Sequence, residues 1–182
     1  MVAGESAGGG LAAELCQRLL DESKNDFSGT GTAGSLPLPV AQLLFYPMLD
    51  DRTCLDEEKN SGPTHFLWNS ISNQYAWSSY LGPGYNPGDA SVPMYAAAAR
   101  REDLSSLPPA WIMVGELDLF LEECQVYADR LKNAGVETEL LELKGVFHGF
   151  FTVGTEETIV TAVWDSFTKF AKRHIKSHKE RR

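Results

Sequence analysis

A serine within a short glycine-rich segment is the first candidate for chemistry in this sequence. Residues 4–8 read G-E-S-A-G, which fits the G-x-S-x-G pattern of a nucleophile elbow. In such an elbow the serine lies on a tight turn between a strand and a helix. We expect Gly4 and Gly8 to flank it because a Cβ at either position would clash across the turn. Ser6 is therefore the candidate nucleophile, and a glycine-rich helix start is the alternative.

A nucleophilic serine needs a base, and the base needs a carboxylate that orients it. The sequence holds four histidines, which are His65, His148, His174 and His178. His148 is the candidate base because it follows a predicted strand directly, where active sites of parallel α/β sheets gather. We expect His174 and His178 to be solvated in the basic tail, whereas His65 falls in an irregular segment. A packed or capping histidine is the alternative for each.

The orienting carboxylate is expected in the loop after the strand that precedes His148. This loop reads G-E-L-D-L-F from position 115. Asp118 is the candidate, since it precedes His148 by just enough residues for one helix and one strand between them. Glu116 is the second candidate, but it lies closer to the end of the strand. The alternative role for either acid is to cap the helix that follows.

Hydrophobic periodicity predicts an alternation of strands and helices. Apolar runs predict strands at 40–46, 110–115 and 139–143, and the first two suit the interior of a parallel sheet. Helical patterns cover 9–22, 70–81, 122–134 and 158–175. This order predicts an α/β fold with a parallel sheet.

Two of these helices are expected to bury a stripe of apolar residues. In the helix at 9–22 the stripe comprises Leu11, Ala12, Leu15, Cys16 and Leu19. In the helix at 122–134 it comprises Val126, Tyr127, Leu131 and Ala134. Both stripes predict the faces that pack on the sheet.

Composition limits the class of protein. The 182 residues are 43% hydrophobic and have a formal net charge of -9, which is enough chain for one globular domain with a core. An acidic surface repels phosphate backbones, so nucleic acid is not an expected partner. We expect no transmembrane segment and no secretory signal. Three widely spaced cysteines fit free thiols in a reducing compartment, which predicts a cytoplasmic protein.

Neither a cofactor nor a metal is expected. Residues 29–34 fit G-x-G-x-x-G, but no strand precedes them and a proline-containing segment follows. A dinucleotide site needs a strand before this motif and a helix after it, so we do not predict one. The His, Cys and acidic residues show no metal-ligand spacing.

Several separated segments together resemble the hormone-sensitive-lipase family of α/β-hydrolases. They are 4–9 (G-E-S-A-G-G), 46–50 (Y-P-M-L-D), 103–109 (D-L-S-S-L-P-P), 118–123 (D-L-F-L-E-E), 127–136 (within which Y-A-D-R-L and A-G-V match) and 148–150 (H-G-F). The resemblance is strong over about residues 1–150, although Leu119 replaces the family's usual proline. It implies an α/β-hydrolase fold with Ser6 as nucleophile, Asp118 as acid and His148 as base.

One family feature is missing from this sequence. Family members carry a His-Gly-Gly-Gly type motif upstream of the serine, whose backbone N–H groups form much of the oxyanion hole, and no His-Gly-Gly occurs here. We therefore expect residues 1–182 to form a single, partial α/β-hydrolase domain, its C-terminal half with the equivalents of strands five to eight. Ala7 is the assignable oxyanion donor, and Glu5 is a candidate binding residue beside the serine.

The resulting functional prediction is a serine carboxylester hydrolase that acts through an acyl-enzyme on short to medium acyl esters, with a small-molecule ester as its partner. An amidase or peptidase of the same fold is one alternative. A non-catalytic remnant or interaction module is another, and an exposed sheet edge would allow homo-oligomers. Trp68, Trp77 and Tyr80 are candidates for an apolar wall of the substrate pocket.

Overall fold

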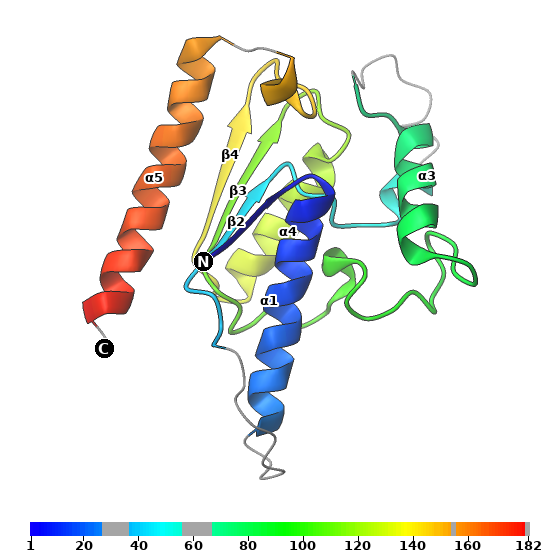
Figure 1. Cartoon of the computed structure of the whole chain (residues 1–182), viewed down its shortest axis with the longest axis horizontal. Helices are drawn as coiled ribbons and strands as arrows, with labels where there is room; N and C mark the ends of the chain where they lie inside the picture. The colour runs from blue at the N-terminus through cyan, green and yellow to red at the C-terminus, as the bar shows by residue number, and fades with distance from the viewer. Residues whose placement is uncertain (27–36, 56–66, 154–155, 181–182) are drawn as a thin grey trace.

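The computed structural model describes residues 1–26, 37–55, 67–153 and 156–180. At its centre, four parallel strands lie side by side in the order in which they occur along the chain (Figure 1). The strands are β1 (Val2–Glu5), β2 (Gln42–Phe45), β3 (Ala110–Gly115) and β4 (Thr138–Leu143). Parallel neighbours need a crossover connection, and helices follow β1 and β3 directly.

Helices lie on both sides of this sheet (Figure 1). They are α1 (Ala7–Asp26), α3 (Ser70–Leu81), α4 (Leu121–Asn133) and α5 (Glu157–Glu180), with 3₁₀ turns at Thr53–Leu55, Ala98–Arg100 and Phe150–Thr152. α1 packs on β1 and β2 and α4 on β3 and β4, whereas α5 covers the opposite side. Right-handed crossovers put α1 and α4 on one face because each new strand is added in the same direction. The predicted α/β fold with a parallel sheet is confirmed.

Two elements have the same bounds in the structure as in the sequence prediction. Ala110–Gly115 is the strand β3, and all of its residues are buried because α4 and α5 cover its two faces. Ser70–Leu81 is the helix α3, whose start is capped by Asn69. The Asn69 side chain accepts a hydrogen bond from the Ser72 N–H at 3.0 Å.

The buried face of α1 differs from the predicted one. Leu11 and Leu15 are 52% and 42% exposed, whereas Ala12, Ala13 and Cys16 are buried. Small side chains face the sheet because they let the helix approach it closely. The larger leucines are turned away from β1 and β2, so only part of the predicted stripe belongs to the core.

Two further predictions of exposure were wrong. Val126 was expected on the buried face of α4 and is 51% exposed. His174 was expected to be solvated and is buried, with its ring 4.5 Å from that of Phe170 and its Nε2 atom 3.5 Å from the Glu137 carboxylate. Within α5, the side chain of His174 lies against Glu137, in the segment that enters β4, rather than in solvent. His65 and the 29–34 segment lie outside the described residues.

Two other kinds of feature are absent from the described ranges. Within these ranges no helix is long and apolar enough to cross a membrane. The same residues include no group of three or more His, Cys, Asp or Glu that could hold a metal ion. The three cysteines are buried free thiols.

Candidate active site

Ser6 lies at a sharp turn between β1 and α1. Its φ angle is 53°, in the left-handed region that non-glycine residues rarely adopt. The Ser6 N–H donates to the Phe45 carbonyl at 2.9 Å, and the Ser6 carbonyl accepts from the N–H groups of Met48 at 2.9 Å and Gly9 at 3.0 Å. Strain of this kind persists only where the surroundings hold it. This is the turn that the G-x-S-x-G pattern predicts.

Close packing at this turn depends on glycines, but not on all of them. A Cβ on Gly4 would lie 2.0 Å from the Gly8 carbonyl oxygen, and a Cβ on Gly10 would lie 2.2 Å from the Met48 carbonyl oxygen. A Cβ on Gly8 would meet open space, so the prediction of a clash at Gly8 was wrong. The reason is that Gly8 presents its carbonyl oxygen, rather than its α-carbon, to the strand.

Three side chains from distant parts of the chain form a hydrogen-bonded row. Ser6 Oγ lies 2.9 Å from His148 Nε2, and His148 Nδ1 lies 2.9 Å from Asp118 Oδ2. Asp118 and His148 are 4% and 5% exposed. The second carboxylate oxygen of Asp118 accepts from the Phe120 N–H at 2.9 Å. The side chains that the sequence singled out therefore converge, with the polarity that general-base activation of a serine needs.

Asp118, rather than Glu116, faces the imidazole. The Glu116 carboxylate instead accepts from the Gly145 N–H at 2.9 Å, in the turn that follows β4. Both acids follow β3, but Asp118 lies at the turn that leads into α4, which directs its side chain inward. The choice between the two candidates agrees with the sequence prediction.

Aromatic rings enclose the imidazole of His148. Phe120 meets it edge-on with ring centroids 5.0 Å apart, and the Tyr46 ring lies 4.9 Å away. Trp68, one of the predicted wall residues, lies at 5.8 Å. These contacts restrict rotation of the imidazole, so its two nitrogens stay directed at the serine and the carboxylate.

Tyr46 connects this aromatic wall to the residue before the nucleophile. Its hydroxyl donates to the Glu5 carboxylate at 2.8 Å, and its φ of 35° is a second left-handed angle at the site. Burial, together with the Glu5 contact, raises the pKa of Tyr46, so the hydroxyl remains a donor. Sequence reasoning missed Tyr46 because it ends an apolar run. Its position in the matched segment 46–50 was the available signal.

Ala7 and Glu5 lie on either side of Ser6 at the surface of the site. Ala7 is the first residue of α1, and both side chains are exposed. The first N–H groups of a helix have no partner within the helix, and this end carries partial positive charge. A negatively charged oxygen is therefore favoured next to Ala7. The oxyanion and binding roles of the two residues remain predictions.

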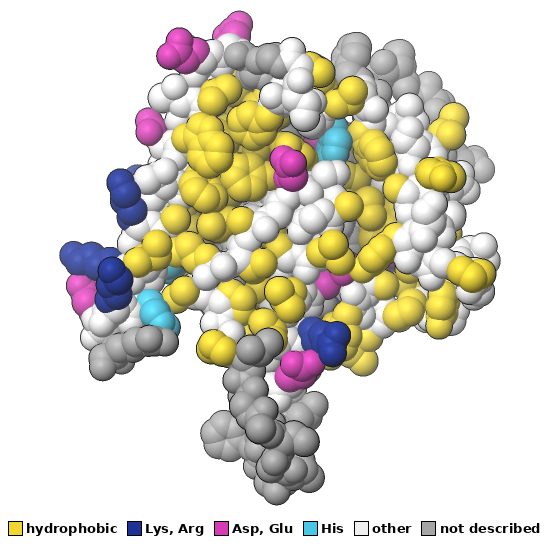
Figure 2. Space-filling model, in the orientation of Figure 1, with side chains coloured by type: hydrophobic (Ala, Val, Ile, Leu, Met, Phe, Trp, Pro, Cys, Tyr) yellow, Lys and Arg dark blue, Asp and Glu magenta, His cyan; other side chains and the backbone are white. Residues whose placement is uncertain are grey.

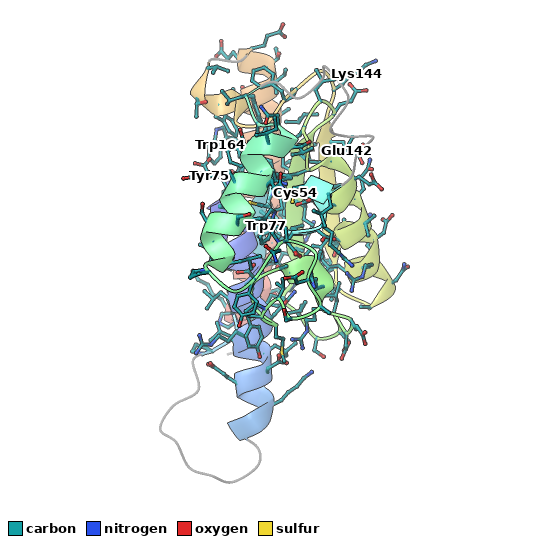
Figure 3. All side chains as sticks on the ribbon, turned by 90° about the vertical axis from the view of Figure 1, so that its right-hand side faces the viewer. Cys54, Tyr75, Trp77, Glu142, Lys144 and Trp164 are labelled. Carbon is teal, nitrogen blue, oxygen red and sulfur yellow. The ribbon has the colours of Figure 1, made fainter. Side chains whose placement is uncertain are left out.

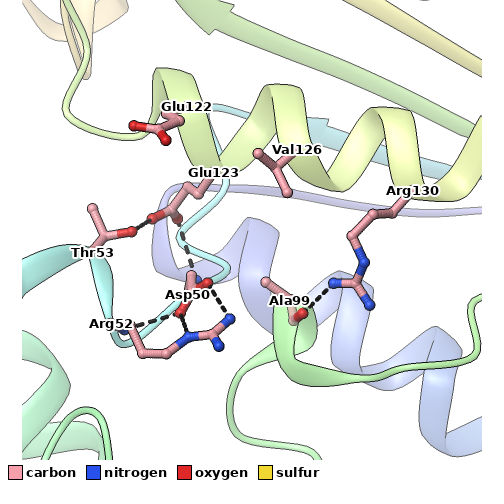
Figure 4. Close-up of a pocket in the computed structure, with 8 residues that line it drawn as sticks. All are labelled: Asp50, Arg52, Thr53, Ala99, Glu122, Glu123, Val126 and Arg130. Atoms are coloured by element: carbon pink, nitrogen blue, oxygen red, sulfur yellow. Dashed lines mark hydrogen bonds and ion pairs between the residues drawn. The ribbon is translucent and has the colours of Figure 1, made fainter.

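A buried carboxyl group that the sequence reasoning missed ties α4 to the loop after β2 (Figure 4). Glu123 Oε1 accepts from the Leu49 N–H at 2.7 Å, and Oε2 accepts from the Thr53 hydroxyl. Burial raises the pKa of Glu123 to about 8, although these hydrogen bonds lower it in part. Met48, in the same loop, holds the nucleophile turn. The sequence signal available for Glu123 was its place as the last acid of the matched segment 118–123. It did not stand out because acids are common in the first turn of a helix.

Beside the site, the described residues leave one edge and part of one face of the sheet uncovered. Among the described residues β1 pairs with β2 alone. A shallow, mainly apolar groove of about 440 Å³ lies there, lined by Ala3, Gly4, Glu5, Phe45, Phe151 and Trp164. Figure 2 shows hydrophobic side chains gathered on this side of the molecule, between α5 and the N-terminal strand. We call this surface the β1–α5 face.

Comparison with known proteins identifies relatives of this chain. Residues 1–152 match a family model described as the α/β-hydrolase fold. Carboxylesterase NlhH of Mycobacterium tuberculosis is 32% identical over 150 residues, which are 82% of this chain and 42% of the relative. Carboxylic ester hydrolase LipN of the same species is 31% identical over 153 residues, which are 84% of this chain and 37% of the relative.

A solved structure agrees with these matches. A bacterial heroin esterase superposes with a TM-score of 0.76 at 34% identity, over 91% of this chain and 49% of that chain. The chain thus spans less than half the length of the curated relatives described above. The resemblance inferred from the six segments is confirmed.

Proposed function

The chain belongs to the α/β-hydrolase fold family, and on that basis we propose that it is part of a serine carboxylester hydrolase. The reaction runs through an acyl-enzyme, and the substrates are esters with short to medium acyl chains. The observation that carries this proposal is the row Ser6–His148–Asp118, with 2.9 Å at each of its two contacts. The esterase names of the relatives support the choice of an ester bond.

Each of the three side chains has a separate role in the proposed reaction. His148 Nε2 accepts the hydroxyl proton as Ser6 Oγ forms a bond to the ester carbonyl carbon. The bond to the leaving oxygen then breaks, and His148 returns the proton to the departing alcohol. Water then attacks the acyl-serine while His148 takes a proton from it. His148 returns this proton to Ser6 Oγ as the carboxylic acid product departs. Asp118 holds the Nδ1–H tautomer and stabilises the imidazolium.

The weakest part of the proposed site is the stabilisation of the oxyanion. We assign one donor, the Ala7 N–H at the start of α1, which would approach the carbonyl oxygen as negative charge develops. Loss of a single oxyanion donor costs roughly 3 kcal/mol in the transition state. The matched segment is 37% and 42% of the two relatives, which leaves room for further donors outside it. We therefore expect low turnover from these 182 residues alone.

The test is Ser6-dependent turnover of p-nitrophenyl butyrate, followed as a pre-steady-state burst. The wild-type chain should release one equivalent of nitrophenol in the burst. Ser6→Ala should abolish the burst and lower turnover roughly 10⁴-fold or more, to the limit of detection where wild-type turnover is low. A variant that keeps more than a few per cent of wild-type turnover would refute the nucleophile assignment. Comparison with the matching anilide separates an esterase from an amidase or peptidase of the same fold.

A second candidate function is an interaction module, and the β1–α5 face is the observation that favours it. Exposed strand edges and apolar patches recruit other chains. In that case the chain should self-associate, with or without Ser6-dependent turnover. Sedimentation of wild type and Ser6→Ala tests the interaction module independently of the turnover assay, because association does not require the serine. A cytoplasmic location remains a prediction that rests on the three free cysteines.

A further inference from the structure

A small groove between α1 and α3 begins beside the nucleophile. It has a volume of about 100 Å³ and is mainly apolar, and its lining residues are Ala7, Gly10, Leu11, Glu14, Met48, Ala76, Trp77 and Tyr80. The contributions from α1 recur every three to four residues, so they form one stripe along the helix. The groove therefore runs along α1, away from Ser6.

The wall formed by α3 is aromatic. Trp77 is 1% exposed and meets the Tyr80 ring in an edge contact of 6.0 Å between centroids. Tyr75, on the same helix, is 77% exposed. The helix therefore turns Trp77, and not Tyr75, toward the body of the protein (Figure 3). Two predicted wall residues, Trp77 and Tyr80, thus line the same groove. Its sides suit a hydrocarbon chain.

The far end of the groove is polar. Glu14 lies two helical turns from Ala7, about 10 Å along the axis at 1.5 Å per residue, and is 5% exposed. The Tyr80 hydroxyl donates to Glu14 Oε2 at 3.0 Å. Burial raises the pKa of Glu14 to about 7, although the Tyr80 hydrogen bond lowers it in part. Among the described residues, no other side chain donates to this carboxyl group, which has room to accept more than one hydrogen bond.

The position of the groove relative to Ser6 and His148 favours the acyl chain of the ester, rather than its alcohol, as the occupant. The leaving alcohol must lie within reach of His148, which protonates it. No residue of the His148 loop lines the groove. Ala7, in contrast, is adjacent to Ser6 and carries the proposed oxyanion donor, so the groove starts where the carbonyl group would be held.

We propose that this groove binds the acyl chain of the ester, and that Glu14, held by Tyr80, selects chains that end in a hydrogen-bond donor. The inference rests on the proposed function and specifies its substrate class. A hydroxyl or ammonium group at the end of the chain would donate to Glu14. A methyl group there would instead leave a buried carboxyl group without a second partner, which is costly in an apolar setting.

The test compares two esters that have the same number of heavy atoms. In p-nitrophenyl 6-hydroxyhexanoate a hydroxyl replaces the terminal methyl of p-nitrophenyl heptanoate, and this length avoids the six-membered lactone that a 5-hydroxy ester would form with release of nitrophenol. The ratio of kcat/KM values, hydroxyl over methyl, should fall about tenfold in Glu14→Leu. Glu14→Gln should keep most of the preference because the amide still accepts. Glu22→Leu is the matched control, since it removes an exposed acid on the same helix outside the groove, and it should leave the ratio unchanged.

A binding measurement separates failure of this inference from failure of the proposed function. In a Ser6→Ala background, calorimetry should show methyl 6-hydroxyhexanoate binding more tightly than methyl heptanoate. Glu14→Leu in the same background should remove the difference, and Tyr80→Phe should reduce it. Equal binding of the two esters, or a preference that survives Glu14→Leu, overturns the inference whether or not the chain turns over esters. Lack of Ser6-dependent turnover, by contrast, argues against the proposed function alone.

Discussion

The two ends of the Ser6–His148–Asp118 row are built in different ways. At one end, Asp118 and His148 are buried between the loops that follow β3 and β4, and aromatic rings enclose the imidazole. At the other end, Ser6 is only part-buried and follows β1, which has one paired edge among the described residues. The acid–base end is held by side-chain packing. The nucleophile end is a strained turn held by backbone hydrogen bonds and by glycines that admit close contact.

This difference predicts different kinds of sensitivity. Changes at the acid–base end should alter proton transfer while the fold persists, because the surrounding rings and the sheet remain in place. Changes at the nucleophile end should act through the fold, since the turn depends on contacts between backbone atoms. The experiments below test that division, from the largest expected effect to the smallest.

Asp118→Asn should give the largest effect, a loss of roughly 10⁴-fold in Ser6-dependent kcat. The amide oxygen can still accept from the Phe120 N–H, so the loop should keep its shape. The amide nitrogen, however, would face His148 Nδ1 and favour the tautomer that cannot take the serine proton. Kinetics with p-nitrophenyl butyrate measure the loss of kcat, and a thermal melt shows whether the fold persists. Glu116→Gln is the control, and a comparable loss in that variant would contradict the assignment of the acid.

Gly10→Ala should destabilise the fold by about 3 kcal/mol, through overpacking. The new Cβ would lie 2.2 Å from the Met48 carbonyl oxygen, and Met48 also bonds to the Ser6 carbonyl. Gly8→Ala is the matched control in the same helix. It should stabilise the protein by about 0.5–1 kcal/mol, because a Cβ there meets open space and alanine favours a helix. Urea unfolding measures both, and equal effects would show that backbone contact does not govern this turn.

Glu123→Gln should change how stability depends on pH. Burial raises the pKa of Glu123 from its ordinary value of 4.5 to about 8, so between these pH values the folded state keeps a proton that the unfolded state loses. The free energy of unfolding should therefore fall as pH rises from about 5 to 8, by on the order of 3 kcal/mol from this group. Glutamine does not titrate, so the variant should show a shallower decline.

Exposed Glu122 provides the control for that experiment, because Glu122→Gln removes the neighbouring acid of the same helical turn. Its pH profile should follow that of the wild type. Buried Glu14, whose pKa is also raised, contributes a similar decline to all three proteins, so only the difference between profiles is diagnostic. Parallel profiles for wild type and Glu123→Gln would show that Glu123 is not protonated in the folded state at neutral pH.

The elements with one dominant local signal were predicted from the sequence. β3 is a continuous apolar run and α3 a helical pattern, and the bounds of both agree with the prediction. The buried face of α1 was predicted only in part, because two stripes in that helix have helical spacing. Leu11 and Leu15 lie on the exposed stripe, whereas Ala12, Cys16 and Leu19 are buried as predicted. Only the approach of the helix to Met48 and the sheet, a long-range contact, decides which stripe is buried.

The same distinction applies to the site. Ser6, Asp118 and His148 occur in recognisable segments, so each could be chosen by its order along the chain and its neighbours. Tyr46 and Glu123 were missed because their partners lie far away in sequence. A tyrosine at the end of an apolar run and an acid in the first turn of a helix each have an ordinary local explanation. Their contacts become visible only once the sheet has brought its strand ends together.

The smallest expected effect concerns the β1–α5 face. Trp164 is 48% exposed on α5 and lines the apolar groove there together with Phe45 and Phe151. If copies of the chain associate through this face, Trp164→Glu should raise the dissociation constant about tenfold, since a charge would replace apolar surface at the contact.

Val126→Glu is the matched control. Val126 is 51% exposed on α4, which covers the other face of the sheet. Sedimentation equilibrium should show weakened association for the first variant and unchanged association for the second. Equal association of both variants with the wild type would point instead to the free edge of β1, where backbone groups rather than side chains make the contact. A wild-type chain that remains monomeric throughout would contradict the prediction of association altogether.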